Sequence, residues 1–270
     1  MMEPLSGQRV QSYLRHLGAS EPSEPTLDYL VRLISAHLER VTFENLDVLL
    51  ERRISLDADA VLGKVTGRGR GGYCYELNSL FARLLLALGN GVCLRAARLR
   101  LLTPDDSPKR TALTHMLLLV EPTNGHRYIV DIGMAQCGLH RALPLEGDVT
   151  PFRVRSMDVT EALEVALPTS DGGWKALYVV EPYDLDWLDF DTFNWSPTRG
   201  VVEKRVMRDE NDILEILRDE FGLNLNAADD EAPLRVRLRG LLDNLIDTGS
   251  EPLSEKADVA GGMMAMFLSQ

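Results

Sequence analysis

The sequence predicts an α+β fold, with a helical first part followed by an antiparallel β part. Helical periodicity dominates up to about residue 90, alternating patterns typical of strands follow from residue 92, and helical patterns return after residue 210. Helices and strands that occupy separate stretches of a chain are typical of α+β proteins, whereas regular alternation would indicate a parallel sheet.

Four helices are expected in the first part. One spans 8–18 and ends at a glycine, and Thr26 begins a second, whose apolar residues recur at i, i+3, i+4 and i+7. A short helix is expected over 57–65. Glycines then interrupt regular structure between residues 67 and 72, before a helix over 73–88 that Gly89 ends.

The alternating patterns predict six strands, over 92–99, 115–120, 127–132, 152–157, 162–167 and 174–180. Residues 121–125, EPTNG, connect the second strand to the third as a hairpin loop. The acidic stretch 181–191 is interpreted as a solvated loop. Two further helices are expected over 211–221 and 232–247.

Charge and hydropathy exclude several classes of protein. The 270 residues include 29 Lys+Arg and 41 Asp+Glu, a net charge of −12, so nonspecific binding to nucleic acid is not expected. Residues 1–100 carry 13 basic and 11 acidic side chains, which would favour an anionic ligand there. The chain has no 18-residue apolar run and no signal-peptide pattern, so we expect no membrane association and a cytoplasmic location.

The strongest local feature is Cys74, within the sequence RGGYCYELN at 70–78. Three cysteines are too few for a disulfide framework, so an isolated cysteine becomes a candidate nucleophile. Cys74 follows two glycines at the predicted start of a helix, where the positive potential favours the thiolate and free backbone N–H groups can stabilise an oxyanion. The alternative is a small buried core residue.

A thiolate nucleophile needs a base, and the base needs a group that orients it. His115 begins a nearly all-apolar strand, and Asp131 lies in the next apolar run, YIVDIG at 128–133. Two polar residues on adjacent buried strands suggest one pair, which would be either catalytic or structural. A two-residue turn at 124–125 would point them to opposite faces, whereas a three-residue loop over 123–125 would place them on one face as diagonal neighbours.

Four segments together resemble the arylamine N-acetyltransferase family: FENLD at 43–47, RGGYC at 70–74 with Glu76 and Asn78, THM at 114–116, and VDIG at 130–133. The resemblance covers residues 14–145. It implies a Cys74–His115–Asp131 triad and acyl transfer from a coenzyme A thioester to an arylamine or hydrazine through an acyl-cysteine.

The same resemblance implies three parts: a helical bundle over 1–90, an antiparallel β-barrel over 91–197 and a C-terminal α/β lid over 198–270. It also implies further site residues. The expected substrate-binding residues are Phe43, Tyr73, Thr114, Gly133 and Met134. Apart from the resemblance, Arg70 lies in the glycine-rich stretch 67–72 and is expected to contact a phosphate of the cofactor. The acyl donor is a co-substrate, so no bound cofactor is expected.

Departures from the family pattern leave alternatives open. Met134 and Ala135 stand where the family usually has Phe-Gly, and residues 198–209 are shorter than the strand pair expected there. Macrolactam-forming amide synthases resemble this family and accept long acyl chains on an acyl carrier protein, so that activity is one alternative. A cysteine hydrolase is another, because a similar triad serves peptidases.

Two weaker motifs carry no function. The glycine-rich stretch GRGRGG at 67–72 lacks the Gly-Lys-Ser/Thr of a P-loop and is interpreted as a turn. Cys137 and His140 have part of a metal-ligand spacing, but no second pair supports them, so no metal is expected.

Overall fold

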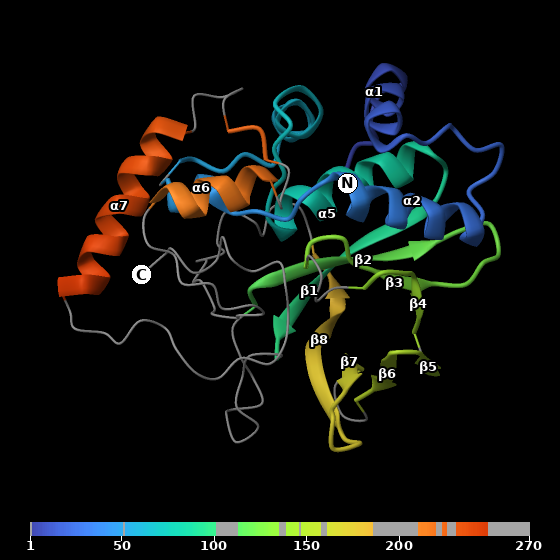
Figure 1. Cartoon of the computed structure of the whole chain (residues 1–270). Helices are drawn as coiled ribbons and strands as arrows, with labels where there is room; N and C mark the ends of the chain where they lie inside the picture. The colour runs from blue at the N-terminus through green and yellow to red at the C-terminus, as the bar shows by residue number, and fades with distance from the viewer. Residues whose placement is uncertain are drawn as a thin grey trace.

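The computed structural model describes residues 2–50, 52–100, 113–134, 139–145, 147–157, 161–185, 210–219, 223–225 and 231–247. Helices gather on one side and strands on the other, with two C-terminal helices beside the first group (Figure 1). The helices are α1 (Gly7–Leu17), α2 (Leu27–Arg40), α3 (Leu46–Leu49), α4 (Ala58–Leu62), the π-helical turn η1 (Gly63–Gly67), α5 (Cys74–Ala87), α6 (Glu210–Asp219) and α7 (Glu231–Asp247).

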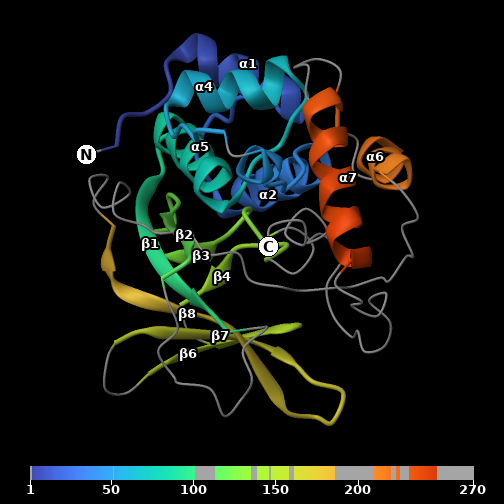
Figure 2. The same ribbon diagram turned by 90° about the vertical axis from the view of Figure 1, so that its left-hand side faces the viewer.

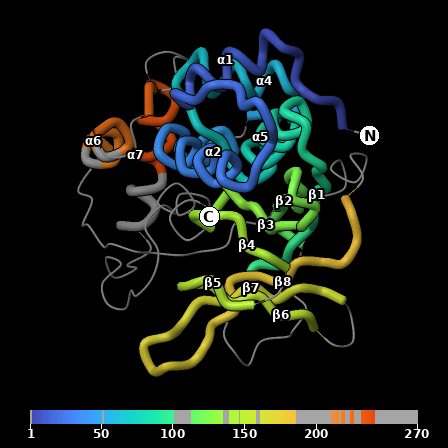
Figure 3. Tube along the Cα trace, turned by 90° about the vertical axis from the view of Figure 1, so that its right-hand side faces the viewer, coloured from blue at the N-terminus to red at the C-terminus, as the bar shows by residue number. Residues whose placement is uncertain are grey.

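All the strands form one antiparallel sheet in the order β4-β3-β2-β1-β8-β7-β6-β5. Their bounds are β1 (Gly91–Leu99), β2 (His115–Glu121), β3 (Tyr128–Val130), β4 (Leu143–Pro144), β5 (Gly147–Val149), β6 (Phe152–Ser156), β7 (Leu163–Pro168) and β8 (Trp174–Asp184). The edge strands β4 and β5 are neighbours in sequence, so the sheet curls until its two edges approach each other (Figure 3). Figure 2 shows β1 to β4 and β6 to β8 as the two halves of this curved sheet. The result resembles a nearly closed barrel, which confirms the mixed α and antiparallel β architecture.

The capping signals of the first helices act as the sequence predicts. Gly18 ends α1 in the left-handed conformation, with φ of 66°. The Thr26 hydroxyl accepts a hydrogen bond from the Tyr29 amide and caps α2. Gly89, with φ of 88°, follows the end of α5. Local sequence therefore determines where these three helices begin or end.

Two expectations need correction, and three short elements were not expected from the sequence. The helix expected over 57–65 is α-helical only to Leu62 and continues as the π-helical turn η1. The stretch expected to be a loop from residue 181 continues β8 to Asp184, because Arg95 and Arg98 on β1 pair with its acidic side chains. The short helix α3 and the edge strands β4 and β5 are too short to give a periodic signal.

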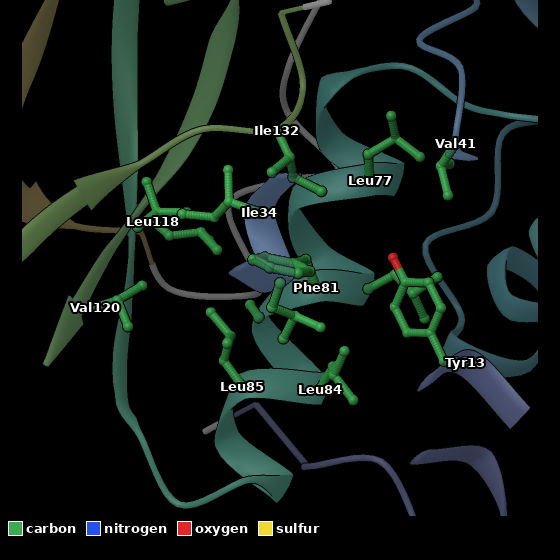
Figure 4. Packing of buried hydrophobic residues seen from close by; sticks show 14 of the residues in the cluster. Tyr13, Ile34, Val41, Leu77, Phe81, Leu84, Leu85, Leu118, Val120 and Ile132 are labelled. Carbon is green, nitrogen blue, oxygen red and sulfur yellow. The ribbon is translucent and has the colours of Figure 1, made fainter. Parts of the chain in front are cut away.

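The main hydrophobic core lies between the helices and one face of the sheet (Figure 4). Phe81 and Leu85 of α5 point towards Leu118 and Val120 of β2, and all four are buried. α5 therefore lies fixed against β2. The first residue of this helix is Cys74 and the first residue of this strand is His115.

The two C-terminal helices pack against the first part of the chain (Figure 3). Leu46 and Leu49 of α3 form a buried cluster with apolar residues of both helices, including Leu214 and Leu234. In the segment between these helices, the Asn224 amide donates a hydrogen bond to the carbonyl of Gly69 at 3.3 Å. The predicted boundary at residue 198 and the strand pair of the lid lie outside the described residues. In the part of the chain that the structure describes, no helix combines the length and hydropathy needed to cross a bilayer.

His37 makes the helical core sensitive to acid. It is fully buried on α2 between the rings of Tyr13 and Phe81, and neither ring nitrogen has a hydrogen-bond partner among the described residues. Burial, with a smaller contribution from the charge of His16, lowers the pKa of His37 to about 3. Between that value and the ordinary 6.5, the unfolded state binds a proton that the folded state excludes. Stability therefore falls as the pH drops through this window.

Replacing His37 with leucine should remove part of this acid sensitivity. The pKa difference corresponds to about 2 kcal/mol of stability lost between pH 7 and pH 5, and His37→Leu should lose about that much less. Urea unfolding at both pH values measures the effect. His126→Ala, at an exposed histidine of the hairpin loop, is the control and should behave as the wild type does. Equal pH dependence in His37→Leu and the wild type would contradict the prediction.

Candidate active site

Cys74 is the first residue of α5 and is 6 % exposed. The segment before it is fixed from two sides. Phe43 pairs with Gly72 in an isolated parallel bridge, and the Tyr73 amide donates to the Glu76 carboxylate at 3.1 Å. This second contact is the half of a capping box in which the N3 glutamate accepts from the N-cap amide, and it fixes the peptide from which α5 begins. The thiol therefore lies in the first turn of a well-anchored helix.

The hairpin β2–β3 brings His115 to Asp131. Leu118 pairs with Val130 and Leu119 with Ile129, so the paired residue numbers add to 248. This is the register of the three-residue loop over 123–125, the alternative that places both side chains on one face. His115 Nε2 lies 2.7 Å from Asp131 Oδ2, and both residues are buried. The expected pairing of these two residues is confirmed.

Asp131 is held by two further contacts. Its Oδ1 accepts from Asn78 Nδ2 at 3.0 Å and from the Gly133 amide at 2.9 Å. Asn78 also donates to the Met116 carbonyl and accepts from the Ile132 amide, so its buried amide is fully engaged. Asn78 belongs to a motif of the family resemblance, but its role in holding Asp131 emerges only from these contacts. Its spacing of four residues from Cys74 already places both on one face of α5.

The imidazole of His115 remains protonated over a wide pH range. Its complete burial lowers the pKa, but the charge and hydrogen bond of Asp131 raise it more, and contacts with the Cys74 thiol add to the rise. The net result raises the pKa of His115 to about 10. The Cys74 thiol thus acts on the same imidazole as Asp131, and this coupling of Cys74, His115 and Asp131 suits a thiolate–imidazolium pair.

Gly133 allows the loop after β3 to approach the nucleophile closely. A Cβ at this position would lie 2.7 Å from the Cys74 Cα and 2.6 Å from Asn78 Nδ2, closer than real contacts allow. Any side chain here would push Asp131 away from α5. The structure therefore assigns Gly133 a packing role beside Cys74, while its predicted contact with substrate stays a prediction.

The other predicted substrate-binding residues lie at different depths. Phe43 is buried in the main core together with Cys74, and Tyr73 is half-buried next to the thiol. Thr114 directly precedes His115. Met134 is buried in the second core, inside the barrel, with Leu117 and Ile129. Their contacts with substrate stay predictions.

Arg70 is placed differently from the expectation. Its side chain is 1 % exposed, and its guanidinium pairs with Glu44 at 2.8 Å and with Asp47 at 3.5 Å. A guanidinium enclosed by two carboxylates is not presented to a cofactor phosphate. The geometry therefore favours a structural role, in which Arg70 fixes the glycine-rich segment before Cys74. Sequence spacing gave no sign of this, because the partners lie 26 and 23 residues away.

The described residues contain no group of three or more His, Cys, Asp or Glu side chains that could hold a metal ion. His140 is exposed, and Cys137 lies outside the described residues, so the partial metal spacing of the sequence is not tested.

A family model and individual relatives both match this chain to N-acetyltransferases. A family model described as N-acetyltransferase matches residues 26–199. The arylamine N-acetyltransferase of Mycolicibacterium smegmatis is 32% identical over 192 residues, which cover 68% of each chain. The arylamine N-acetyltransferase / N-hydroxyarylamine O-acetyltransferase of Salmonella typhimurium is 38% identical over 140 residues, 52% of this chain and 48% of its own.

A solved structure extends the similarity to the fold. The arylamine N-acetyltransferase of Mycobacterium marinum in complex with CoA has a TM-score of 0.75 and 28% identity, over 86% of this chain and 98% of its own. The similarity therefore reaches beyond the helical part and includes the sheet.

Proposed function

Because the chain belongs to the arylamine N-acetyltransferase family, we propose that it transfers an acetyl group from acetyl-CoA to an arylamine or hydrazine through an acetyl-cysteine at Cys74. The observation that carries this proposal is the buried chain of contacts from the Cys74 thiol through His115 to Asp131. The relative solved with CoA supports coenzyme A as the carrier of the acyl group.

In the first half-reaction, the Cys74 thiolate attacks the thioester carbonyl. Backbone N–H groups of the first turn of α5 are placed to stabilise the oxyanion that develops. The bond between the carbonyl carbon and the CoA sulfur then breaks, and His115 donates its proton to the departing thiolate. Cys74 is left as a thioester and the imidazole of His115 is left neutral.

In the second half-reaction, the amine attacks the acetyl-cysteine carbonyl. Neutral His115 accepts the proton that the amine loses, the bond to the Cys74 sulfur breaks, and the thiolate–imidazolium pair is restored. Asp131 keeps the imidazole in one orientation through both steps and stabilises its charged form. Burial of all three groups limits competing attack by water.

Acetyl transfer is favoured over the two alternatives of the sequence analysis. The relatives reported above are named arylamine N-acetyltransferases, and none of them is named an amide synthase or a hydrolase. A carrier-protein donor, antibiotic synthesis and a cytoplasmic location stay predictions from the sequence.

Product analysis tests the function directly. Purified protein with acetyl-CoA and an arylamine should release CoA and acetylated amine in equal amounts. Without amine, CoA release should stop after about one equivalent per protein. Continued release without amine would identify a hydrolase. Transfer only from a long carrier-bound acyl chain would favour an amide synthase.

Met134 is expected to set the size of the acceptor. A flexible methionine in place of a rigid aromatic should accommodate larger substrates. Met134→Phe should raise kcat/KM for a small arylamine and lower it for a bulky one, with a combined swing of about tenfold. Steady-state kinetics with one amine of each size measures this. Met157→Phe, the same exchange at the end of β6, is the control. Parallel changes on both amines would mean that Met134 does not select substrates.

A further inference from the structure

Lys64 is buried close to the start of α5, and the mechanism above does not use it. It lies in the π-helical turn η1, with its side chain 4 % exposed. Its ammonium lies 2.9 and 3.2 Å from the two carboxylate oxygens of Glu76 and 2.6 Å from Asp47. Glu44 lies 3.6 Å away. A lysine this deep in a protein is retained only where several charged partners compensate for the lost hydration.

Glu76 connects this lysine to the nucleophile. It lies two residues after Cys74 in the first turn of α5, and its Oε2 accepts the amide hydrogen of Tyr73. A Cβ on Gly72 would lie 3.0 Å from the same oxygen. The carboxylate of Glu76 thus fixes the peptide unit between Gly72 and Tyr73, one residue before Cys74.

The charge on Glu76 depends on Lys64. Burial raises the pKa of the Glu76 carboxyl, and the charge and hydrogen bond of Lys64 are the strongest of the effects that oppose this rise. Without the ammonium, Glu76 has two states open to it. It can stay charged and disfavour a thiolate two residues away, or take up a proton and become a weaker acceptor for the Tyr73 amide.

The other charged groups nearby do not replace Lys64. Arg70 pairs with Glu44 and Asp47, and Arg52 pairs with Asp47 at the exposed edge of the cluster. At Glu76, the positive charge that opposes the effect of burial is that of Lys64. Around Cys74, the titratable groups are His115 of β2, Asp131 beyond β3, and Tyr73, Tyr75 and Glu76 at the start of α5.

We propose that Lys64 is a positioning residue, which keeps Glu76 charged and fixed and thereby holds Cys74 in its reactive form and orientation. The inference rests on the proposed role of Cys74 as the nucleophile. The inference assigns a function to η1, because this wider π-helical turn carries a lysine that reaches three carboxylates from two segments of the chain, 44–47 and the start of α5.

Alkylation of Cys74 by iodoacetamide tests this without any substrate. In Lys64→Met, the rate constant of alkylation at pH 7, per folded protein, should fall about tenfold. The midpoint of the pH profile of this rate constant should move to higher pH, because the thiolate is disfavoured. That midpoint belongs to the coupled Cys74–His115 pair. Lys64→Arg should retain most of the rate. Peptide mapping separates Cys74 from the exposed Cys93, and circular dichroism of each variant gives the folded fraction to which the rate refers.

Two further variants show whether the effect passes through Glu76. The double variant Lys64→Met/Glu76→Gln removes both charges and keeps an oxygen for the Tyr73 amide, so its rate should return to within about threefold of the wild type. Arg52→Met removes a charge that also contacts Asp47, and should leave the rate unchanged.

The inference is overturned if folded Lys64→Met reacts at the wild-type rate, or if Arg52→Met slows the reaction as much. If Lys64→Met does not fold, the double variant decides, because a loss of more than about tenfold there would show that Lys64 does not act through the charge of Glu76. Alkylation needs neither acetyl-CoA nor an amine. Failure of the proposed acetyl transfer therefore stays distinguishable from failure of this inference.

Discussion

Replacing Cys74 with serine should abolish acetyl transfer while leaving the fold intact. Serine is only slightly smaller than cysteine and is compatible with the first turn of a helix. Its hydroxyl has a far higher pKa than a thiol, so the imidazolium of His115 cannot hold it as an anion. We expect kcat/KM to fall on the order of a thousandfold or more.

Mass spectrometry of the intact wild type after acetyl-CoA should show one acetyl group, and peptide mapping should place it on Cys74. Cys93→Ser is the matched control, since Cys93 is exposed on β1 and outside the chain of contacts with His115. It should keep wild-type activity. An adduct on Cys93 or Cys137 in place of Cys74 would refute the assignment of the nucleophile.

Replacing Asp131 with asparagine should lower the rate by about ten-thousandfold, the effect that the wrong imidazole tautomer has in a comparable triad. The contacts of Oδ1 with Asn78 and Gly133 are compatible with an amide oxygen. The amide nitrogen would then face His115 Nε2 and require it to accept a hydrogen bond. The ring proton would move to Nδ1, the nitrogen that remains for Cys74, and His115 could no longer take a proton from the thiol.

The same substitution should reduce stability by a few kcal/mol, because a buried charged partner is lost. Denaturant unfolding and steady-state kinetics on the same preparation separate the two effects. Asp148→Asn, at an exposed carboxylate on β5, is the control for both measurements. Activity of Asp131→Asn near that of the wild type would mean that the aspartate has only a structural role.

The order of helices and strands was predictable because it depends on short-range periodicity. Thr26, Gly18 and Gly89 end or begin helices through contacts within a few residues. The continuation of β8 to Asp184 was not predictable. It depends on pairing with β1, some 85 residues earlier in the chain, and the acidic residues alone indicated a loop.

The candidate site also has features that were predictable from the sequence and features that were not. Motif order and spacing identified Cys74, His115 and Asp131, and the hairpin arithmetic limited their pairing to two registers. Only the folded hairpin decided between those registers. Arg70 shows the converse case: its place in a glycine-rich segment suggested a phosphate, but Glu44 and Asp47, distant in sequence, enclose it in the fold.

The sequence by itself determined the α+β class, the family resemblance and the residue types of the candidate triad, because these depend on local pattern and composition. The tertiary structure alone decided which charges are neutralised and which are presented to a ligand. Nothing in the linear sequence indicates that five charged residues lie together in the fold: Lys64, Arg70, Glu44, Asp47 and Glu76. In the fold they form one network of ion pairs under the first turn of α5. An isolated charge is too costly to remove from water, whereas a charge that is paired with opposite charges can be buried.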